Sequence, residues 1–362
     1  MEFFLVDWIK NLPWWWLIIS STVVALLVTW FTIPVIVTVS KHLGFFEKNK
    51  KRGSHNGAVP TLGGVAIFSG IVIAASIFTP EAVVQQYRYV LAAMVILFFT
   101  GVKDDMIGID PKKKLLAQIV VALIMILLAD IRITTFHGFL GIHDIPYWLS
   151  LVFTVFVYLV IINGFNLIDG IDGLSSGVAI LSSSVFGVLF ILAGGYDYAF
   201  QAFILVGALA AFFRFNVFSQ KNKIFLGDTG SLTIGFLMAL IAITFLECDR
   251  LGGLHRSLSS IPVMALGILI VPLFDTARVF VIRTLRGESP FKADRKHIHH
   301  RLLDLGCSHL IATLIIIAAN LLILASIFIF RDLRGWIQFI IIMFLAAGLS
   351  YIPIYLVDRR RK

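Results

Sequence analysis

Eleven apolar stretches of membrane-crossing length run through the 362-residue chain. A helical span needs about 20 apolar residues, and somewhat fewer inside a bundle. The chain is 59% hydrophobic and only 14% charged, which is more apolar surface than a water-soluble fold of this length can bury. The sequence therefore predicts an all-α polytopic membrane protein forming one domain over residues 1–362. Hydropathy places its spans at about 14–38, 62–79, 88–102, 115–129, 147–162, 174–193, 199–214, 229–246, 261–283, 309–330 and 336–356.

Basic residues are distributed unevenly between the two sets of loops. The loops after the odd-numbered spans, with the adjoining span ends and the C-terminal tail, hold 23 of the 30 Lys and Arg residues. Cytoplasmic loops carry such an excess, so we expect the N-terminus outside and the C-terminus in the cytoplasm. Anionic lipid headgroups account for the net charge of +9, and nucleic-acid binding is not expected. The cytoplasmic loops are then about 39–61, 103–114, 163–173, 215–228 and 284–308.

One polar run stands out after the fifth span. It reads Asn163-Gly-Phe-Asn166-Leu-Ile-Asp169-Gly-Ile-Asp172-Gly. Unpaired carboxylates at a membrane boundary are costly, so these acids are candidates for a functional site. Two Asp-Gly steps three residues apart let the backbone turn tightly while both carboxylates face one site. A helix-ending turn explains a single step, but the whole run favours a site for a metal ion or a polyanion.

Two further acidic segments are expected on the cytoplasmic side. Asp104 and Asp105 are adjacent at the end of the third span, and their repulsion indicates a nearby cation, a shared proton or both. Lys114 opens the fourth span, where it suits either an ion pair with these acids or a phosphate at headgroup depth. The run Gly-Asp-Thr-Gly-Ser at 227–231 opens the eighth span, and free N–H groups at a helix start attract phosphate.

The longest basic loop, at 284–308, contains Asp294 and the sequence His297-Ile-His299-His300-Arg301. Zinc binding is not indicated, because cysteine partners and the His-Glu-x-x-His pattern are absent from the sequence. Imidazoles among Arg and Lys side chains are typical of a donor cluster for phosphate oxygens. A solvated basic loop is the alternative, and it explains the basic residues better than the histidines.

Hard oxygen ligands, a basic loop and a lipid-embedded scaffold together suit a divalent cation and a diphosphate. With these features the chain resembles the polyprenyl-phosphate N-acetylhexosamine-1-phosphate transferases, glycosyltransferase family 4, which includes the WecA-type enzymes. The first cytoplasmic loop departs from the family pattern, with Glu47 in place of an Asp and Arg52-Gly-Ser-His55 in place of Arg-Lys-x-His. The resemblance rests on pieces that occur in family order: Gly57-Ala-Val-Pro60-Thr-Leu-Gly63-Gly64, Asp104-Asp105, Lys114-Leu-Leu-Ala-Gln118, 163–174, 227–231, Pro272-Leu-Phe-Asp275 and 289–301.

The resemblance implies transfer of N-acetylhexosamine-1-phosphate, in the simplest case GlcNAc-1-phosphate, from a UDP-sugar to undecaprenyl phosphate, with release of UMP. Such a reaction is the first membrane step of a cell-surface glycan, such as an O-antigen or a teichoic acid. It would take place on the cytoplasmic face of a bacterial inner membrane and use Mg²⁺, or Mn²⁺ in its place. A second copy of the chain is left open as a partner.

Residue roles follow from the same resemblance. A metal ion would be held by Asp228, Asn166 and Asp169. Lys114 would contact the acceptor phosphate, and the 297–301 segment would hold the donor from a position farther into the cytoplasm. The expected catalytic acids are Asp104, Asp105, Asp169 and Asp172. The expected substrate contacts are Glu47, Arg52, His55, Lys114, Asn163, Asn166, Asp294, His297, His299, His300 and Arg301.

Three alternatives remain open from the sequence: another UDP-sugar as donor, a covalent aspartyl-phosphate intermediate, and an ion-coupled transporter. Transporters place their acids near the bilayer midplane and often show paired halves. Here the acids lie at span ends and no internal repeat is visible, which favours an enzyme. A phosphate monoester is mostly dianionic at neutral pH, so the Asp104–Asp105 pair could orient the acceptor and hold metal instead of removing a proton.

Overall fold

The computed structural model describes residues 13–44, 59–248, 260–285, 287 and 297–360. Helices dominate this part of the chain, and one short hairpin interrupts them. The helices are α2 (Trp14–Leu43), α3 (Gly63–Phe78), the 3₁₀ turn η1 (Glu81–Val83), α4 (Val84–Ile107), α5 (Pro111–Leu127), α6 (Tyr147–Ile168), α7 (Leu174–Leu192), α8 (Tyr196–Phe218), α9 (Gly227–Leu246), α10 (Ile261–Ile268), α11 (Ile270–Leu285), α12 (Ile298–Asp304), α13 (His309–Ile329) and α14 (Gly335–Arg360).

Each of the eleven predicted spans coincides with a helix, and the ninth is divided between α10 and α11. Among the described residues, seven helices are long and apolar enough to cross a membrane. The number rises to nine if each of two bent helix pairs, α3 with α4 and α10 with α11, counts as one span. The polytopic helical architecture is therefore confirmed. The count of eleven spans and the orientation of the termini stay predictions.

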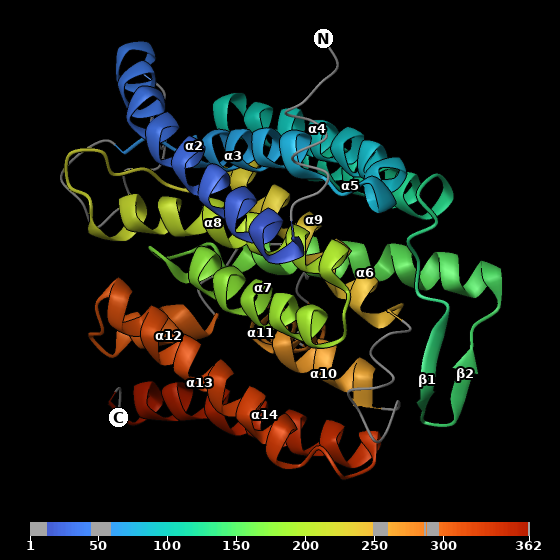
Figure 1. The fold of residues 1–362 in the computed structure, drawn as a ribbon. Helices are drawn as coiled ribbons and strands as arrows, with labels where there is room; N and C mark the ends of the chain where they lie inside the picture. The colour runs from blue at the N-terminus through green and yellow to red at the C-terminus, as the bar shows by residue number, and fades with distance from the viewer. Residues whose placement is uncertain (1–12, 45–58, 249–259, 286, 288–296, 361–362) are drawn as a thin grey trace.

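Helix α9 forms the core of the bundle (Figure 1). It packs against α3, α4, α6, α7, α8 and α10, and 89% of its apolar window is buried, against 22% for α2. Figure 1 shows α2 to α5 on one side of this core and α10 to α14 on the other. The start of α9, which carries Asp228, is therefore surrounded by the ends of other helices.

Two glycines allow α3 and α4 to touch the backbone of α9. A Cβ atom on Gly64 would lie 2.1 Å from the backbone nitrogen of Gly230, and one on Gly101 would lie 2.4 Å from the Cα of Thr229. Only glycine fits at such separations. In addition, Gly64 N–H donates to the carbonyl of Leu226 at 3.0 Å. This close packing places the acid pair at the end of α4 beside the first turn of α9.

The predicted ninth span is broken, because α10 and α11 meet at a bend of 80°. A break leaves carbonyl groups without helical donors, and buried ones need other partners. The carbonyl of Ile268 accepts from Ser182 Oγ at 3.0 Å and from Asn320 Nδ2 at 3.5 Å. These side chains stabilise the break, and α11 then runs toward the basic segment at 297–301.

One short hairpin, which was not predicted from the sequence, interrupts the helices. Residues 135–144 form an antiparallel hairpin of β1 (Thr135–Phe139) and β2 (Ile142–Asp144) between α5 and α6. Gly138 near the end of β1 and Gly141 in the turn both have a φ of +79°, a conformation that glycine adopts without strain. The hairpin is tied to the C-terminal end of α9, where Thr134 N–H donates to Glu247 at 2.7 Å. It therefore lies at the opposite end of α9 from Asp228.

Candidate active site

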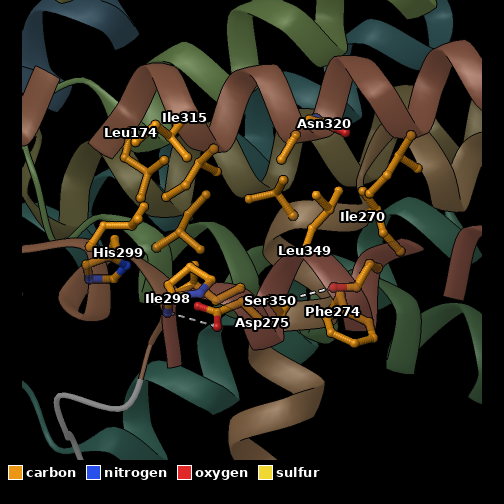
Figure 2. Close-up of a pocket in the computed structure, with 18 residues that line it drawn as sticks. Leu174, Ile270, Phe274, Asp275, Ile298, His299, Ile315, Asn320, Leu349 and Ser350 are labelled. Atoms are coloured by element: carbon orange, nitrogen blue, oxygen red, sulfur yellow. Dashed lines mark hydrogen bonds between the residues drawn. The ribbon is translucent and has the colours of Figure 1, made fainter. Parts of the chain in front are cut away.

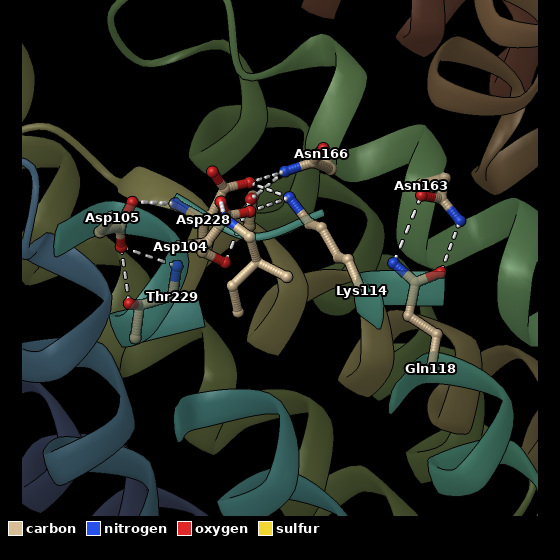
Figure 3. Close-up of polar contacts among 10 residues, drawn as sticks. Asp104, Asp105, Lys114, Gln118, Asn163, Asn166, Asp228 and Thr229 are labelled. Atoms are coloured by element: carbon tan, nitrogen blue, oxygen red, sulfur yellow. Dashed lines mark hydrogen bonds and ion pairs between the residues drawn. The ribbon is translucent and has the colours of Figure 1, made fainter. Parts of the chain in front are cut away.

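Asp228, in the first turn of α9, is the centre of a polar cluster (Figure 3). Its Oδ1 accepts hydrogen bonds from Lys114 Nζ at the start of α5 and from Asn166 Nδ2 near the end of α6, the latter at 2.6 Å. Lys114 Nζ also lies 3.0 Å from Asp104 Oδ2, at the end of α4. The structure thus brings together four of the predicted residues, each supplied by a different helix. The sequence predicted that Lys114 contacts either acidic side chains or a phosphate. In the structure it contacts the carboxylates of Asp104 and Asp228.

Asp104 and Asp105 are neighbours in sequence but have different partners. Asp104 faces Lys114 and also accepts from the N–H of Ile109 at 2.8 Å. Asp105 faces α9 instead, where it accepts from the N–H groups of Asp228 and Thr229 at 2.7 and 3.0 Å and from the Thr229 hydroxyl at 2.6 Å. Figure 3 shows Asp105 and Thr229 on one side of Asp228, with Lys114 on the other.

Asn163 lies one helical turn from the cluster and is held by Gln118. Its Nδ2 donates to Gln118 Oε1 at 2.7 Å, and Gln118 Nε2 donates back at 3.3 Å. Gln118 is four residues beyond Lys114 on α5, and Asn163 is three before Asn166 on α6, so each pair shares one helix face. The amide pair therefore sets the register of Lys114 against Asn166. This contact was not foreseen, although Gln118 belongs to one of the family pieces.

Asp169 follows the end of α6 and lies among other acids. Burial raises its pKa well above the usual range, and the charges of Asp228, Asp105 and Asp172 raise it further. Such repulsion favours a bound cation or a shared proton. Asn166 turns its amide nitrogen toward Asp228 and Ser231, so in this arrangement it orients the Asp228 carboxylate. Within the described segments, no three His, Cys, Asp or Glu side chains converge as a ready-made metal site.

Asp172 belongs to a second cluster. Its Oδ2 accepts from Lys223 Nζ at 2.7 Å and lies 3.2 Å from His309 Nδ1. Burial acts to raise the pKa of Asp172, but hydrogen bonds from His309 and Lys223 outweigh it and hold the pKa below its usual range. Asp172 is therefore an ionised carboxylate with two basic partners. Neither Lys223 nor His309 was predicted. The only signal in the sequence was the position of Lys223, four residues before the Gly-Asp-Thr-Gly-Ser run at 227–231.

The basic segment is anchored by Asp275 of α11. Asp275 Oδ2 lies 2.9 Å from His297 Nδ1, and its Oδ1 accepts from Ile298 N–H at 3.2 Å and from Arg278 at 2.9 Å. Arg278 lies three residues beyond Asp275 on α11, and the contact of Asp275 with His297 was not predicted from the sequence. His297 is 5% exposed and His299 is 2% exposed. These two histidines therefore pack into the protein and are not part of a solvated loop. The expected position of the segment farther into the cytoplasm stays a prediction.

His299 connects this segment to the Asp-Gly turns. A Cβ atom on Gly170 would lie 2.3 Å from His299 Nε2, an atom for which no hydrogen-bond partner occurs in the described part of the chain. Burial lowers the pKa of His299 to about 3, and the nearby charge of His300 acts in the same direction, so this imidazole is neutral. His300 stacks obliquely on His299 with ring centres 4.2 Å apart, and Arg301 lies 3.6 Å from Asp304.

An apolar cavity lies beside His299 (Figure 2). It is lined by side chains of α7, α11, α12, α13 and α14, including Leu174, Phe274 and Leu349. Figure 2 shows His299 at one end of the lining and Asp275 between the helices. The predicted contacts Glu47, Arg52, His55 and Asp294 lie outside the described residues. The described site thus consists of the Asp228 and Asp172 clusters, with the His297–Arg301 segment packed against the turn between Asp169 and Asp172.

The chain is similar in sequence to a known family and to several named proteins. The family model described as Glycosyl transferase family 4 matches residues 87–246, which include Asp104, Lys114, Asn166 and Asp228. An undecaprenyl-phosphate alpha-N-acetylglucosaminyl 1-phosphate transferase of Yersinia pestis is 31% identical over 80% of this chain and 78% of its own length. The protein of the same name from Escherichia coli O157:H7 is 30% identical over 86% and 84%.

A third relative comes from Bacillus subtilis. A probable undecaprenyl-phosphate N-acetylglucosaminyl 1-phosphate transferase of Bacillus subtilis (strain 168) is 28% identical over 89% of this chain and 87% of its own length. Similarity therefore extends over most of the chain. These matches establish that the chain belongs to glycosyl transferase family 4, as its sequence motifs predicted.

Proposed function

We propose that the protein transfers GlcNAc-1-phosphate from UDP-GlcNAc to undecaprenyl phosphate, giving a diphosphate-linked lipid and UMP as the first membrane step of a cell-surface glycan. The observation that carries the proposal is the meeting of Asp104, Lys114, Asn166 and Asp228 at the ends of four helices of a membrane bundle. The names of the relatives supply the sugar and the lipid.

The position of the cluster suits two substrates of opposite character. The acceptor has a long apolar chain that needs lipid, and the donor is soluble, so their phosphates meet at the membrane boundary. The excess of Lys and Arg in the loops on this side supports a cytoplasmic active site, an external N-terminus and, in a bacterium, the inner membrane. Phosphoryl transfer then depends mainly on charge neutralisation and in-line positioning, which a cluster of fixed charges provides.

The carboxylates of the site suit Mg²⁺, with Mn²⁺ as a substitute, because carboxylate oxygens are the ligands that these hard cations prefer. Asp228 and Asp169 would hold the ion. Burial, and after it the charges of the neighbouring acids, raise the pKa of Asp169, and a bound cation would offset both effects. When bound, Mg²⁺ supplies positive charge to the donor diphosphate. Asn166 keeps the Asp228 carboxylate oriented by its 2.6 Å hydrogen bond.

The remaining residues divide between the two substrates. Lys114, at the start of α5, would contact the acceptor phosphate, and Asp104 would orient its ammonium group from 3.0 Å. On the donor side, Arg301 and His300 would supply positive charge and hydrogen-bond donors to phosphate oxygens. His299 is neutral and buried, so its role would be to hold the Gly170 turn. Asp172 would lie by the donor, oriented by Lys223.

A donor panel tests the proposal. The full-length protein in nanodiscs is given undecaprenyl phosphate, Mg²⁺ and one of UDP-GlcNAc, UDP-GalNAc, UDP-glucose or UDP-MurNAc-pentapeptide. The proposal expects UMP release with UDP-GlcNAc that depends on both the lipid and Mg²⁺. Faster turnover of another UDP-sugar would keep the reaction class and change the substrate. Absence of lipid-dependent UMP release with every donor would refute the proposal.

A further inference from the structure

The first turn of α9 lacks an N-cap side chain of its own, because Leu226 stands at the N-cap position. Asp105 of α4 takes that place from another helix. It accepts from the N–H groups of Asp228 and Thr229, the second and third residues of α9. These are the groups that an N-cap side chain normally satisfies. A negative charge at this position also interacts favourably with the helix dipole.

Gly227 and Thr229 of α9 both pack closely against the Asp105 carboxylate. Gly227, the first residue of α9, has a φ of +71°, and a Cβ atom there would lie 2.7 Å from Asp105 Oδ2 and 2.1 Å from the carbonyl of Thr61. The Thr229 hydroxyl adds a third hydrogen bond to Asp105, at 2.6 Å. A carboxylate offers about four acceptor positions, so three of those of Asp105 are used by α9.

The consequence concerns the residue held between these contacts. The N–H of Asp228 points to Asp105, while its carboxylate points to Lys114 and Asn166. Movement of this peptide would therefore change the direction of the carboxylate that the proposed reaction needs most. Asp104, by contrast, directs Oδ2 to Lys114, on the side of the cluster where the substrates would lie.

We infer that Asp105 and Thr229 are positioning residues, which fix the Asp228 peptide so that its carboxylate faces Lys114 and Asn166, and that Asp105 touches neither substrate. The inference rests on the proposed function and gives Asp104 and Asp105 different roles. Asp104 faces the reacting groups, and Asp105 acts through Asp228. Thr229 is then a residue through which the contribution of Asp105 can be tested without altering a carboxylate.

The experiment is a double-mutant cycle on the full-length protein in nanodiscs, with kcat and both KM values measured for UDP-GlcNAc and undecaprenyl phosphate. Thr229→Val keeps the shape but removes the hydroxyl donor, and it should lower kcat about 10-fold with each KM within about 2-fold. Thr229→Ser restores the hydroxyl and should recover most of the rate. Thr233→Val is the matched control: Thr233 is buried one turn further along α9, its hydroxyl bonds the carbonyl of Thr229, and kcat should stay near wild type.

The cycle is completed with Asp105→Ala. In the Asp105→Ala background, adding Thr229→Val should lower kcat by less than about 3-fold, because the hydrogen bond between Thr229 and Asp105 is already absent. The inference would be overturned if the decreases in kcat of the two single variants multiplied in the double variant. It would also be overturned if Thr229→Val kept the wild-type kcat. If Asp105→Ala does not fold, the Thr229→Val, Thr229→Ser and Thr233→Val series decides alone. Wild-type UMP release tests the proposed function separately, since the inference is judged only on ratios of variants to an active wild type.

Discussion

Lys114→Met removes the ammonium group that Asp104 and Asp228 share. Its Nζ lies 3.0 Å from Asp104 Oδ2 and donates to Asp228 Oδ1, and methionine keeps most of the length and the helix propensity of lysine. A hydrogen bond to a charged group is worth about 1.5–3 kcal/mol, which corresponds to roughly 10- to 150-fold at 1.36 kcal/mol per decade. We therefore expect kcat/KM for undecaprenyl phosphate to fall by that factor, mainly through KM, with some loss of kcat because the transition state binds more strongly than the ground state.

Lys114→Met should weaken acceptor binding but strengthen the apparent affinity for Mg²⁺. Without the ammonium group, the two carboxylates are left with uncompensated negative charge, so the Mg²⁺ concentration for half-maximal activity should fall. Lys112→Met and Lys113→Met are matched controls, because both side chains are exposed on the same turn of α5. The assay is two-substrate kinetics in nanodiscs at several Mg²⁺ concentrations. Unchanged acceptor kinetics together with an unchanged Mg²⁺ requirement would refute the placement of Lys114.

Three further outcomes are expected. Asp228→Asn removes a charge with little change in shape, so a Mg²⁺ titration should show weaker apparent metal affinity as well as a lower rate; a wild-type metal requirement would exclude Asp228 as a ligand. Gly170→Ala should cost about 1–3 kcal/mol of stability in thermal unfolding, because its Cβ would lie 2.3 Å from His299 Nε2; an unchanged melting temperature would contradict this packing. A cysteine at Asn49 should be labelled only from the cytoplasm and one at Asp197 only from outside; labelling from the same side would overturn the span count between them.

Much of the helical framework could be predicted because lipid imposes a simple rule on sequence. A chain that crosses a bilayer must satisfy its backbone within helices and face lipid with apolar side chains, so windows of hydropathy coincide with α2 to α11, α13 and α14. The candidate site was predictable for a related reason. Polar side chains at span ends are few, and those at 104, 114, 166 and 228 meet around one point.

What could not be predicted depends on contacts between distant segments. Asp104 and Asp105 differ because Gly101 lets α4 touch the start of α9, which leaves Asp105 against Thr229. The burial of His299 depends on how α12 packs against the turn at Gly170. The hairpin at 135–144 gave only a weak signal, since its two glycines also fit an ordinary loop. Pairings of this kind are fixed by packing, and no local pattern reports them.

The central claim is that a sugar phosphate, and not a sugar alone, moves to the lipid. Mass spectrometry of the lipid product, with the released nucleotide identified in the same reaction, tests it most directly. We expect one UMP per lipid and a mass gain over undecaprenyl phosphate equal to one N-acetylglucosamine phosphate less one water. Release of UDP with a gain of the sugar alone would show ordinary glycosyl transfer and would contradict transfer of the sugar phosphate.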